Sequence, residues 1–152
     1  MQYGKTYWVA YAVKLGQDTL GNYVSLFDLH APTGSLNVGP GVVGVWADNG
    51  NLRVVRSWNS NTASSQTGCS PTQYVVRPCG YSQDIPTDTS SWNYIVMKIS
   101  LHWSDSNPGM KVWYAKNNGD VQLVYDVKGG VGYNEPNLPQ FIYPKMGLYN
   151  WS

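Results

Sequence analysis

This chain of 152 residues has little charge: charged residues make up 12% of it, and the formal net charge is only +1. A nucleic-acid-binding domain normally carries clustered Lys and Arg, so that class of partner is excluded. No apolar run reaches the roughly 18–20 residues needed to cross a bilayer, and no membrane span is predicted. The first residues also lack the apolar segment of a signal peptide.

Residues that carry common hydrolytic chemistry are scarce too. The chain has two His and two Cys, and Glu135 is its only Glu. A glycosidase built on two glutamates is therefore excluded, while paired aspartates stay open. The sequence has no Gly-x-Ser-x-Gly motif, and neither His neighbours a plausible nucleophile, which argues against a serine or cysteine hydrolase.

The two cysteines, Cys69 and Cys79, lie in one turn-rich stretch. A disulfide between them would close a short loop, stabilise the fold by roughly 2–3 kcal/mol, and indicate an oxidising compartment. Two free thiols in a cytosolic protein are the alternative. Because neither His lies near the cysteines, no zinc site is predicted. We expect the disulfide, and with it an extracellular location.

Aromatic and small polar residues replace the missing charge, with 12 Tyr, 7 Trp and 16 Gly. Tyr and Trp have an apolar face and a polar tip that suit sugar rings, although β-sheets favour aromatic residues in any case. The composition and length predict one domain over residues 1–152, with a β-rich extracellular fold.

Apolar and polar residues alternate with a period of two through most of the chain, and no amphipathic helix is evident. About nine strands separated by turn residues predict an all-β fold, an antiparallel β-sandwich or jelly roll. The stretch 59–91 is expected to be a functional loop. The expected strands are Tyr7–Leu15, Val24–His30, Val42–Ala47, Leu52–Trp58, Gln73–Val76, Tyr94–Trp103, Lys111–Lys116, Val121–Val127 and Lys145–Tyr149.

Two acidic, Asn-rich turns, 48–50 and 117–120, have residues that calcium prefers. Hairpin turns use the same residues, so we predict turns there and no cofactor or metal, with calcium as the weaker alternative.

Side chains two residues apart on a strand point to the same face. Asp28 and His30 therefore share one face, and Lys145, Gly147 and Tyr149 share another. If these two sets of side chains, which belong to separate strands, meet in one groove, the site contains an imidazole, a phenol and an ammonium group. Such groups suit proton abstraction beside a carboxylate. In Tyr94–Trp103, alternate residues from Ile95 to Trp103 form an apolar row, while Lys98 and His102 lie on the mixed row of a concave or ordinary outer face.

These motifs resemble the concanavalin-like jelly-roll polysaccharide lyases, a group that includes alginate, glucuronan and heparin lyases. Asp28-Leu-His30 stands where alginate lyases carry Gln-Ile-His. The closing strand, Tyr143-Pro-Lys-Met-Gly-Leu-Tyr-Asn-Trp151, is similar to the family's Tyr-Phe-Lys-Ala-Gly-Val-Tyr-Asn-Gln.

The resemblance implies β-elimination on an acidic, uronate-containing polysaccharide. Tyr149 matches the family's catalytic tyrosine, which acts as base, acid or both, and His30 matches its catalytic histidine. Lys145 would hold a negative group of the substrate, and Asp28 occupies the place of the glutamine that neutralises the carboxylate. The candidate substrate-binding residues are Tyr143, Asn150, Lys98 and His102.

The chain also departs from the family. An ionised Asp28 would repel a uronate, so it serves only when protonated or when it orients His30. The family's arginine strand would precede Tyr7, where only six residues stand, so one or both terminal strands of the jelly roll are expected to be missing. A partner assembly or a homo-oligomer would then cover the sheet edges.

Two functions follow from these observations. The first is a polysaccharide lyase, supported by His30 and by Lys145 with Tyr149. The second is a non-catalytic carbohydrate-binding or adhesion module of the same fold, such as a phage tail or capsid appendage, supported by Asp28 and the missing arginine strand. Either would act outside the cell or on a virion surface.

Overall fold

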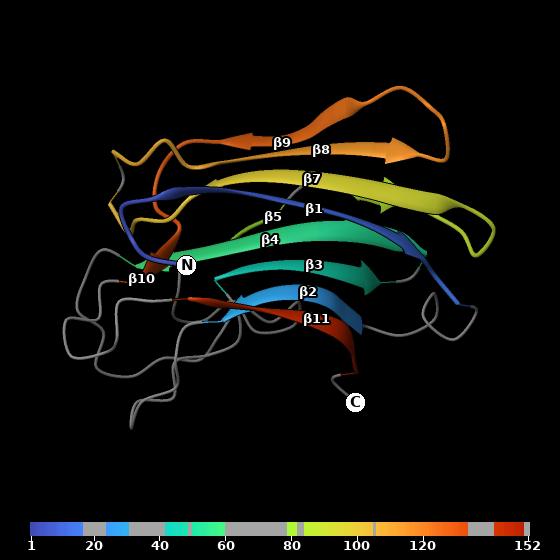
Figure 1. The fold of residues 1–152 in the computed structure, drawn as a ribbon, viewed down its shortest axis with the longest axis horizontal. Helices are drawn as coiled ribbons and strands as arrows, with labels where there is room; N and C mark the ends of the chain where they lie inside the picture. The colour runs from blue at the N-terminus through green and yellow to red at the C-terminus, as the bar shows by residue number, and fades with distance from the viewer. Residues whose placement is uncertain are drawn as a thin grey trace.

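The computed structural model describes residues 1–16, 24–30, 42–48, 50–59, 79–81, 84–104, 106–133 and 142–150. For residues 48, 59, 79–81, 133 and 148–150, it describes the backbone and not the side chains. The described residues form two β-sheets packed face to face, as Figure 1 shows. This confirms the predicted all-β fold and β-sandwich. The described residues contain no helix with the length and hydrophobicity of a membrane span.

The first sheet has four strands in the order β1-β7-β8-β9, and every neighbouring pair is antiparallel. β1 is paired along its whole length with β7, from Thr6 opposite Ser100 to Lys14 opposite Trp92. The strands are β1 (Thr6–Lys14), β7 (Trp92–Ser100), β8 (Met110–Lys116) and β9 (Gln122–Val127).

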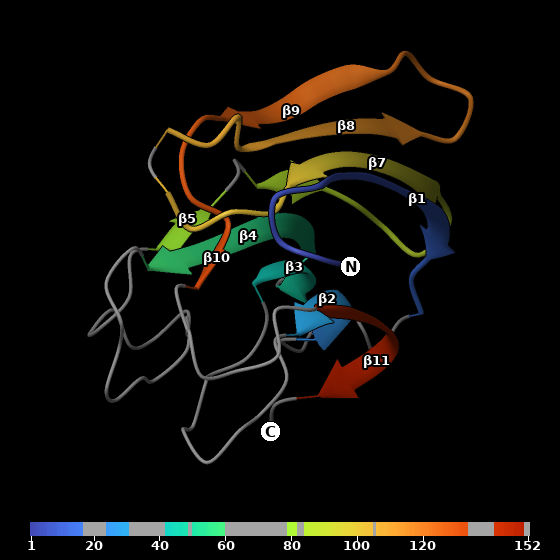
Figure 2. The same cartoon turned by 60° about the vertical axis from the view of Figure 1, so that its left-hand side comes forward.

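The second sheet has seven strands in the order β10-β4-β3-β2-β11, with β5 and β6 also paired to β4 (Figure 2). Its pairs are antiparallel except for the short parallel pair of β10 with β4. The strands are β2 (Val24–His30), β3 (Val43–Asp48), β4 (Asn51–Asn59), β5 (Cys79–Tyr81), β6 (Ile85–Pro86), β10 (Gly132–Tyr133) and β11 (Tyr143–Asn150).

The hydrophobic core lies between the two sheets and follows the period-two pattern of the strands. On β7, Ile95, Met97 and Ile99 are almost completely buried, while Tyr94 and Lys98 are exposed on the opposite face. This confirms the face assigned to that apolar row. At its end, Trp103 is only half-buried; its ring stacks on His102 and meets Tyr3 edge to face.

Most of the predicted strands agree with the structure to within a few residues at each end. β5, β6 and β10 were not predicted, because segments of two or three residues are too short to show a period. Two of these strands lie within the stretch 59–91 that was expected to be a loop, so that expectation was partly wrong. The predicted strand Gln73–Val76 lies outside the described residues.

The two Asn-rich turns behave as hairpin connections. Asp48 pairs with Asn51 across the β3–β4 turn, where Gly50 has a φ of +76°. Asn117 follows β8 with a φ of +51°, and its side-chain oxygen accepts a hydrogen bond from the backbone of Trp92. Asn tolerates a positive φ better than most residues, which explains its use at the second turn.

Candidate functional site

The site begins with the direct pairing of β2 and β11 in the seven-stranded sheet. In the antiparallel register, Lys145 lies opposite Asp28, and Tyr143 lies opposite His30. Directly opposed residues of an antiparallel pair project from the same face with their Cβ atoms about 5 Å apart. The pairing therefore brings together the Asp28–His30 segment and the closing strand, whose candidate side chains the sequence placed on separate strands.

A β-bulge in β2 adds a third residue to this face. Ser25 lies opposite Trp46 of β3, whereas Phe27 lies opposite the next residue, Val45, so that the bulge gives β2 an extra residue. Simple alternation would place Ser25 and Asp28, three residues apart, on opposite faces. Because of the bulge they meet, and the Ser25 hydroxyl donates a hydrogen bond of 2.5 Å to Oδ2 of Asp28.

Asp28 is a buried carboxyl group with only 6% of its surface exposed. Burial raises its pKa above the usual 3.8, while the side chains of Ser25 and Trp46 and the charge of Lys145 act in the opposite direction. Gly44 makes room for this carboxyl group: a Cβ atom there would lie 2.8 Å from Oδ1 of Asp28 and 2.6 Å from the Trp46 indole nitrogen. The sequence predicted Asp28 but gave no sign of the three residues that surround it.

His30 lies beside Asp28 at the end of β2, with Nε2 4.0 Å from Oδ2 of the carboxyl group. This distance is too long for a hydrogen bond, so Asp28 bonds to Ser25 and does not hold the His30 ring directly. The ring stacks on Tyr143 with 6.0 Å between the centroids. Burial and, secondarily, the charge of Lys145 lower the pKa of His30 below 6.5, so the neutral imidazole predominates at neutral pH.

Lys145 is the exposed cation of the site. Its Nζ atom lies 5.7 Å from the centre of the Tyr143 ring, within the range of a cation–π contact. Its charge contributes to the lowered pKa of His30 and offsets part of the rise that burial causes in the pKa of Asp28. The described part of the site is thus a buried carboxyl group, a half-buried imidazole, an aromatic ring and an exposed ammonium group on neighbouring strands.

Two predicted site residues of β11, Tyr149 and Asn150, have only their backbones described. Tyr149 lies opposite Ser25 and Asn150 opposite Val24, after a register shift that follows Met146. The Tyr149 backbone therefore lies opposite the residue whose hydroxyl group bonds to Asp28, while the Tyr149 side chain is outside the description. Cys69 and the side chain of Cys79 are also outside it, so the disulfide remains a prediction.

Lys98 and His102 are not part of this site. Lys98 projects from the outer face of the four-stranded sheet, with Nζ 5.6 Å from the centre of the Trp8 ring. His102 follows β7, where its backbone pairs with Val131 and its ring stacks on Trp103. The sequence indicated the mixed row to which both belong, but not which sheet that row would occupy.

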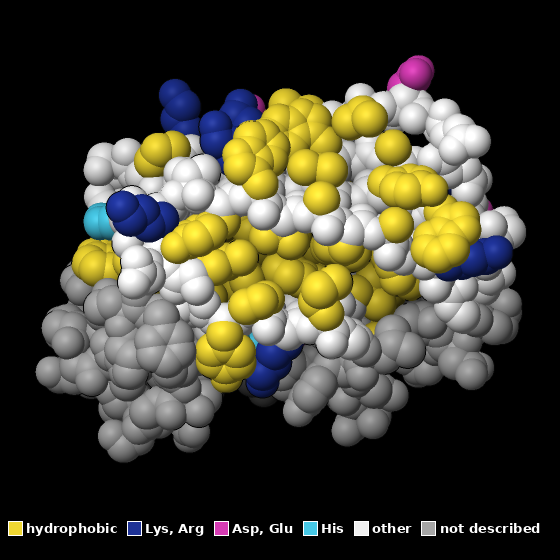
Figure 3. Space-filling view, in the orientation of Figure 1, with side chains coloured by type: hydrophobic (Ala, Val, Ile, Leu, Met, Phe, Trp, Pro, Cys, Tyr) yellow, Lys and Arg dark blue, Asp and Glu magenta, His cyan; other side chains and the backbone are white. Residues whose placement is uncertain are grey.

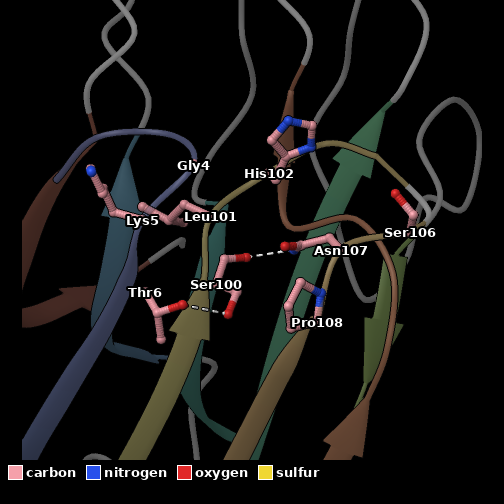
Figure 4. A pocket seen from close by; sticks show the side chains of 9 residues that line it. All are labelled: Gly4, Lys5, Thr6, Ser100, Leu101, His102, Ser106, Asn107 and Pro108. Carbon is pink, nitrogen blue, oxygen red and sulfur yellow. Dashed lines mark hydrogen bonds between the residues drawn. The ribbon is translucent and has the colours of Figure 1, made fainter.

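His102 instead lines a small cleft of about 300 Å³ at the end of β7. Figure 4 shows this cleft between the segment before β1 and the loop that leads into β8. Its polar groups are largely occupied by hydrogen bonds within the protein. The hydroxyl groups of Thr6 and Ser100 are hydrogen-bonded to each other, and the Asn107 amide donates to backbone carbonyls. His102 Nδ1 accepts a hydrogen bond from the backbone of Ser104. These contacts stabilise the loop.

Among the described residues, no group of three or more His, Cys, Asp or Glu side chains could hold a metal ion. No family model matches this chain, and neither a curated protein nor a solved structure is significantly similar to it. Its functional interpretation therefore rests on the geometry of the site and on the motif resemblance.

Proposed function

We propose that this protein is a lyase-like domain that binds an acidic, uronate-containing polysaccharide where β2 meets β11. The observation that carries the proposal is the cross-strand pairing of Tyr143 with His30 and of Lys145 with Asp28. This pairing unites the two motifs on which the resemblance to jelly-roll polysaccharide lyases rests, although they are more than a hundred residues apart.

The described side chains suit an acidic sugar chain. The stacked rings of His30 and Tyr143 offer an aromatic surface to the apolar face of a sugar. Lys145, exposed beside them, supplies a positive charge for a uronate carboxylate. Asp28 in its neutral form can donate a hydrogen bond to that carboxylate, and its raised pKa extends the pH range in which it is neutral.

We also propose that the domain cleaves this polysaccharide by β-elimination. His30, neutral at neutral pH, would accept the proton from C5 of the uronate, and Lys145 would stabilise the negative charge that develops on the carboxylate. The C4–O bond then breaks as the C4–C5 double bond forms. Tyr149, as the matching tyrosine of the family, would donate a proton to the departing oxygen.

A non-catalytic binding module is the second candidate, and Asp28 is the observation that favours it. The family's neutral glutamine is replaced here by a carboxyl group that Ser25 and Trp46 help to keep ionised. An ionised Asp28 would oppose the charge that elimination builds up, so a domain that only binds sugar is compatible with this residue. An adhesion domain of a phage tail or capsid would be such a module.

Location and assembly belong to the same proposal. An acidic polysaccharide lies outside cells, so we place the protein in an extracellular setting or on a virion surface. β1 and β11 are edge strands of their sheets within the described residues. Exposed strand edges invite further pairing, which supports a second copy or a parent assembly as their cover.

The decisive experiment combines cleavage and binding. We would follow the ultraviolet absorbance of unsaturated uronates during incubation with alginate, glucuronan, heparin and pectate. We expect absorbance to rise with one substrate for wild type and to stay flat for Tyr149→Phe, which retains the ring and removes the hydroxyl group. Full activity in Tyr149→Phe would refute its assignment as the acid.

Binding of the same polymers separates the two candidates. A flat absorbance trace with binding that His30→Gln/Lys145→Gln weakens relative to wild type would establish the non-catalytic module. Absence of both cleavage and binding across the panel would refute both proposals. Val121→Ala, which shortens an exposed side chain just before β9 of the other sheet, is the matched control.

A further inference from the structure

We propose that the outer face of the four-stranded sheet is a second polysaccharide-binding surface, centred on Trp8 and Lys98. It lies on the sheet opposite to the one that carries Asp28 and His30, and it shares no residue with the proposed function, so either can fail alone. We call it the tryptophan surface, and its residues are Trp8, Trp92, Tyr94, Val96, Lys98 and Trp113.

This surface is unusually apolar for a solvent-facing sheet. Trp8 is 63% exposed, Trp92 47% and Tyr94 41%. Figure 3 shows hydrophobic side chains gathered over the four-stranded sheet, with Lys and Arg side chains beside them at one end. Contiguous exposed aromatic residues of this kind commonly mark a binding site.

The strand register explains how the aromatic side chains form one surface. Trp8 lies opposite Lys98, and Ala10 lies opposite Val96, which in turn lies opposite Trp113. Trp8 and Trp113 therefore reach diagonally across β7, and their rings stack with 5.6 Å between the centroids and an angle of 17°. Small side chains at Ala10 and Ala12 leave the neighbouring part of β1 low and flat.

The stacked pair is preorganised for a ligand. Trp113 supports Trp8 and restricts its rotamers, yet most of the Trp8 side chain still faces solvent. A ring that is held in place before binding loses less conformational entropy when a ligand stacks on it. Sugar rings stack on indole through their C–H faces while their hydroxyl groups stay in water.

Charge indicates which sugars would bind. Lys98 is exposed with its Nζ atom 5.6 Å from the Trp8 ring, and it forms no salt bridge within the described residues. Lys111 of β8 lies opposite Lys98 and forms a salt bridge of 2.7 Å with Asp126. Lys98 is thus available for a carboxylate or sulfate group on a sugar stacked against Trp8, which favours an acidic polysaccharide.

A protein partner fits the surface less well. The centres of protein–protein interfaces are depleted in charged residues, whereas Lys98 lies directly beside the Trp8 ring. A second copy of the chain would bring the same lysines together on both sides of the contact, including Lys14 at the end of β1. An acidic polysaccharide carries a charge opposite to that of the lysines, and each of its sugar rings has an apolar face that can stack on an indole ring.

The test is affinity electrophoresis in gels that contain polygalacturonate or the neutral polymer hydroxyethylcellulose. All variants would be made in the His30→Gln/Lys145→Gln background, in which the β2–β11 site is disabled. We expect polygalacturonate to retard that background protein, and Trp8→Ala to weaken its binding by about tenfold, equivalent to about 1.4 kcal/mol. Trp8→Tyr should restore most of the affinity, and Lys98→Gln should remove the preference for polygalacturonate over the neutral polymer.

Val121→Ala is again the control, because Val121 is 70% exposed and lies outside the tryptophan surface. Equal binding by Trp8→Ala and Val121→Ala would overturn the proposal. So would a complete loss of binding in the background protein, which would leave the β2–β11 site as the only one. A wild-type dimer in sedimentation that Trp8→Ala dissociates would overturn it as well, because a second copy would then occupy the surface.

Discussion

The outer faces of the two sheets differ in the kind of side chain that each exposes and buries. The seven-stranded sheet buries a polar cluster, in which Asp28 and Ser25 are 6% and 1% exposed. The four-stranded sheet exposes Trp8, Trp92 and Tyr94 to solvent. Both arrangements cost free energy, since buried carboxyl groups lose hydration and exposed indoles forgo burial. Features that a fold retains at such a cost are candidates for function.

The two faces should respond very differently to the loss of a tryptophan. Trp46 is 4% exposed beside Asp28, and Trp8 is 63% exposed. We expect Trp46→Ala to lower the free energy of unfolding by about 3–5 kcal/mol, because it leaves a cavity and an exposed carboxyl group. Trp8→Ala should cost less than about 1 kcal/mol. Urea denaturation of both variants measures the difference, and equal losses would contradict this description of the two faces.

Enlarging a small side chain should also affect the stability of the two faces differently. A Cβ atom at Gly44 would come within 3.0 Å of the side chains of Trp46, Asp28 and Val55. We expect Gly44→Ala to destabilise the fold by about 1–3 kcal/mol through overpacking. Ala10→Val, which adds bulk to an exposed position of β1, should change stability by less than about 0.5 kcal/mol. Thermal unfolding compares them, and an unchanged Gly44→Ala would show that the cluster is loosely packed.

The polar face should also give stability an unusual pH dependence. Burial raises the pKa of Asp28, so the native state binds more protons than the unfolded state above pH 3.8, and stability falls as the pH rises through the Asp28 pKa. The pKa of His30 is lowered, so its contribution has the opposite sign and stability is lost on acidification below pH 6.5.

Single variants separate the two contributions. Asp28→Asn should remove the loss of stability with rising pH, and His30→Gln should remove the loss on acidification. Unfolding free energies measured from pH 4 to pH 8 provide the test. An unchanged profile in Asp28→Asn would mean that Asp28 titrates as it does in the unfolded chain.

The smallest effect is expected at a surface ion pair on the four-stranded sheet. Lys111 and Asp126 lie 2.7 Å apart, but both side chains are more than 40% exposed. Solvent screens such pairs, so we expect Lys111→Gln to change stability by less than about 1 kcal/mol. The same variant should leave Trp8-dependent sugar binding intact. A loss of binding equal to that of Lys98→Gln would extend the cation site to β8.

Much of the fold was predictable because buried strands impose a period of two on their residues. The alternation of Ile95, Met97 and Ile99 with polar neighbours identified the core face of β7 correctly. The shared face of Asp28 and His30 followed from the same rule. β5, β6 and β10 were missed because their hydrogen bonds to β4 leave no pattern in two or three residues.

The sequence alone determined the all-β class, the main strands and the residues that each regular stretch of strand turns to one face, because side-chain direction along an unbulged strand is a local property. Only the tertiary structure decided which strands are neighbours. It placed Lys98 on a different sheet from Asp28, and it brought Lys145 beside Asp28 across more than a hundred residues. It also introduced the bulge that brings Ser25 to Asp28, because a bulge depends on the register with the partner strand and leaves no mark in local alternation.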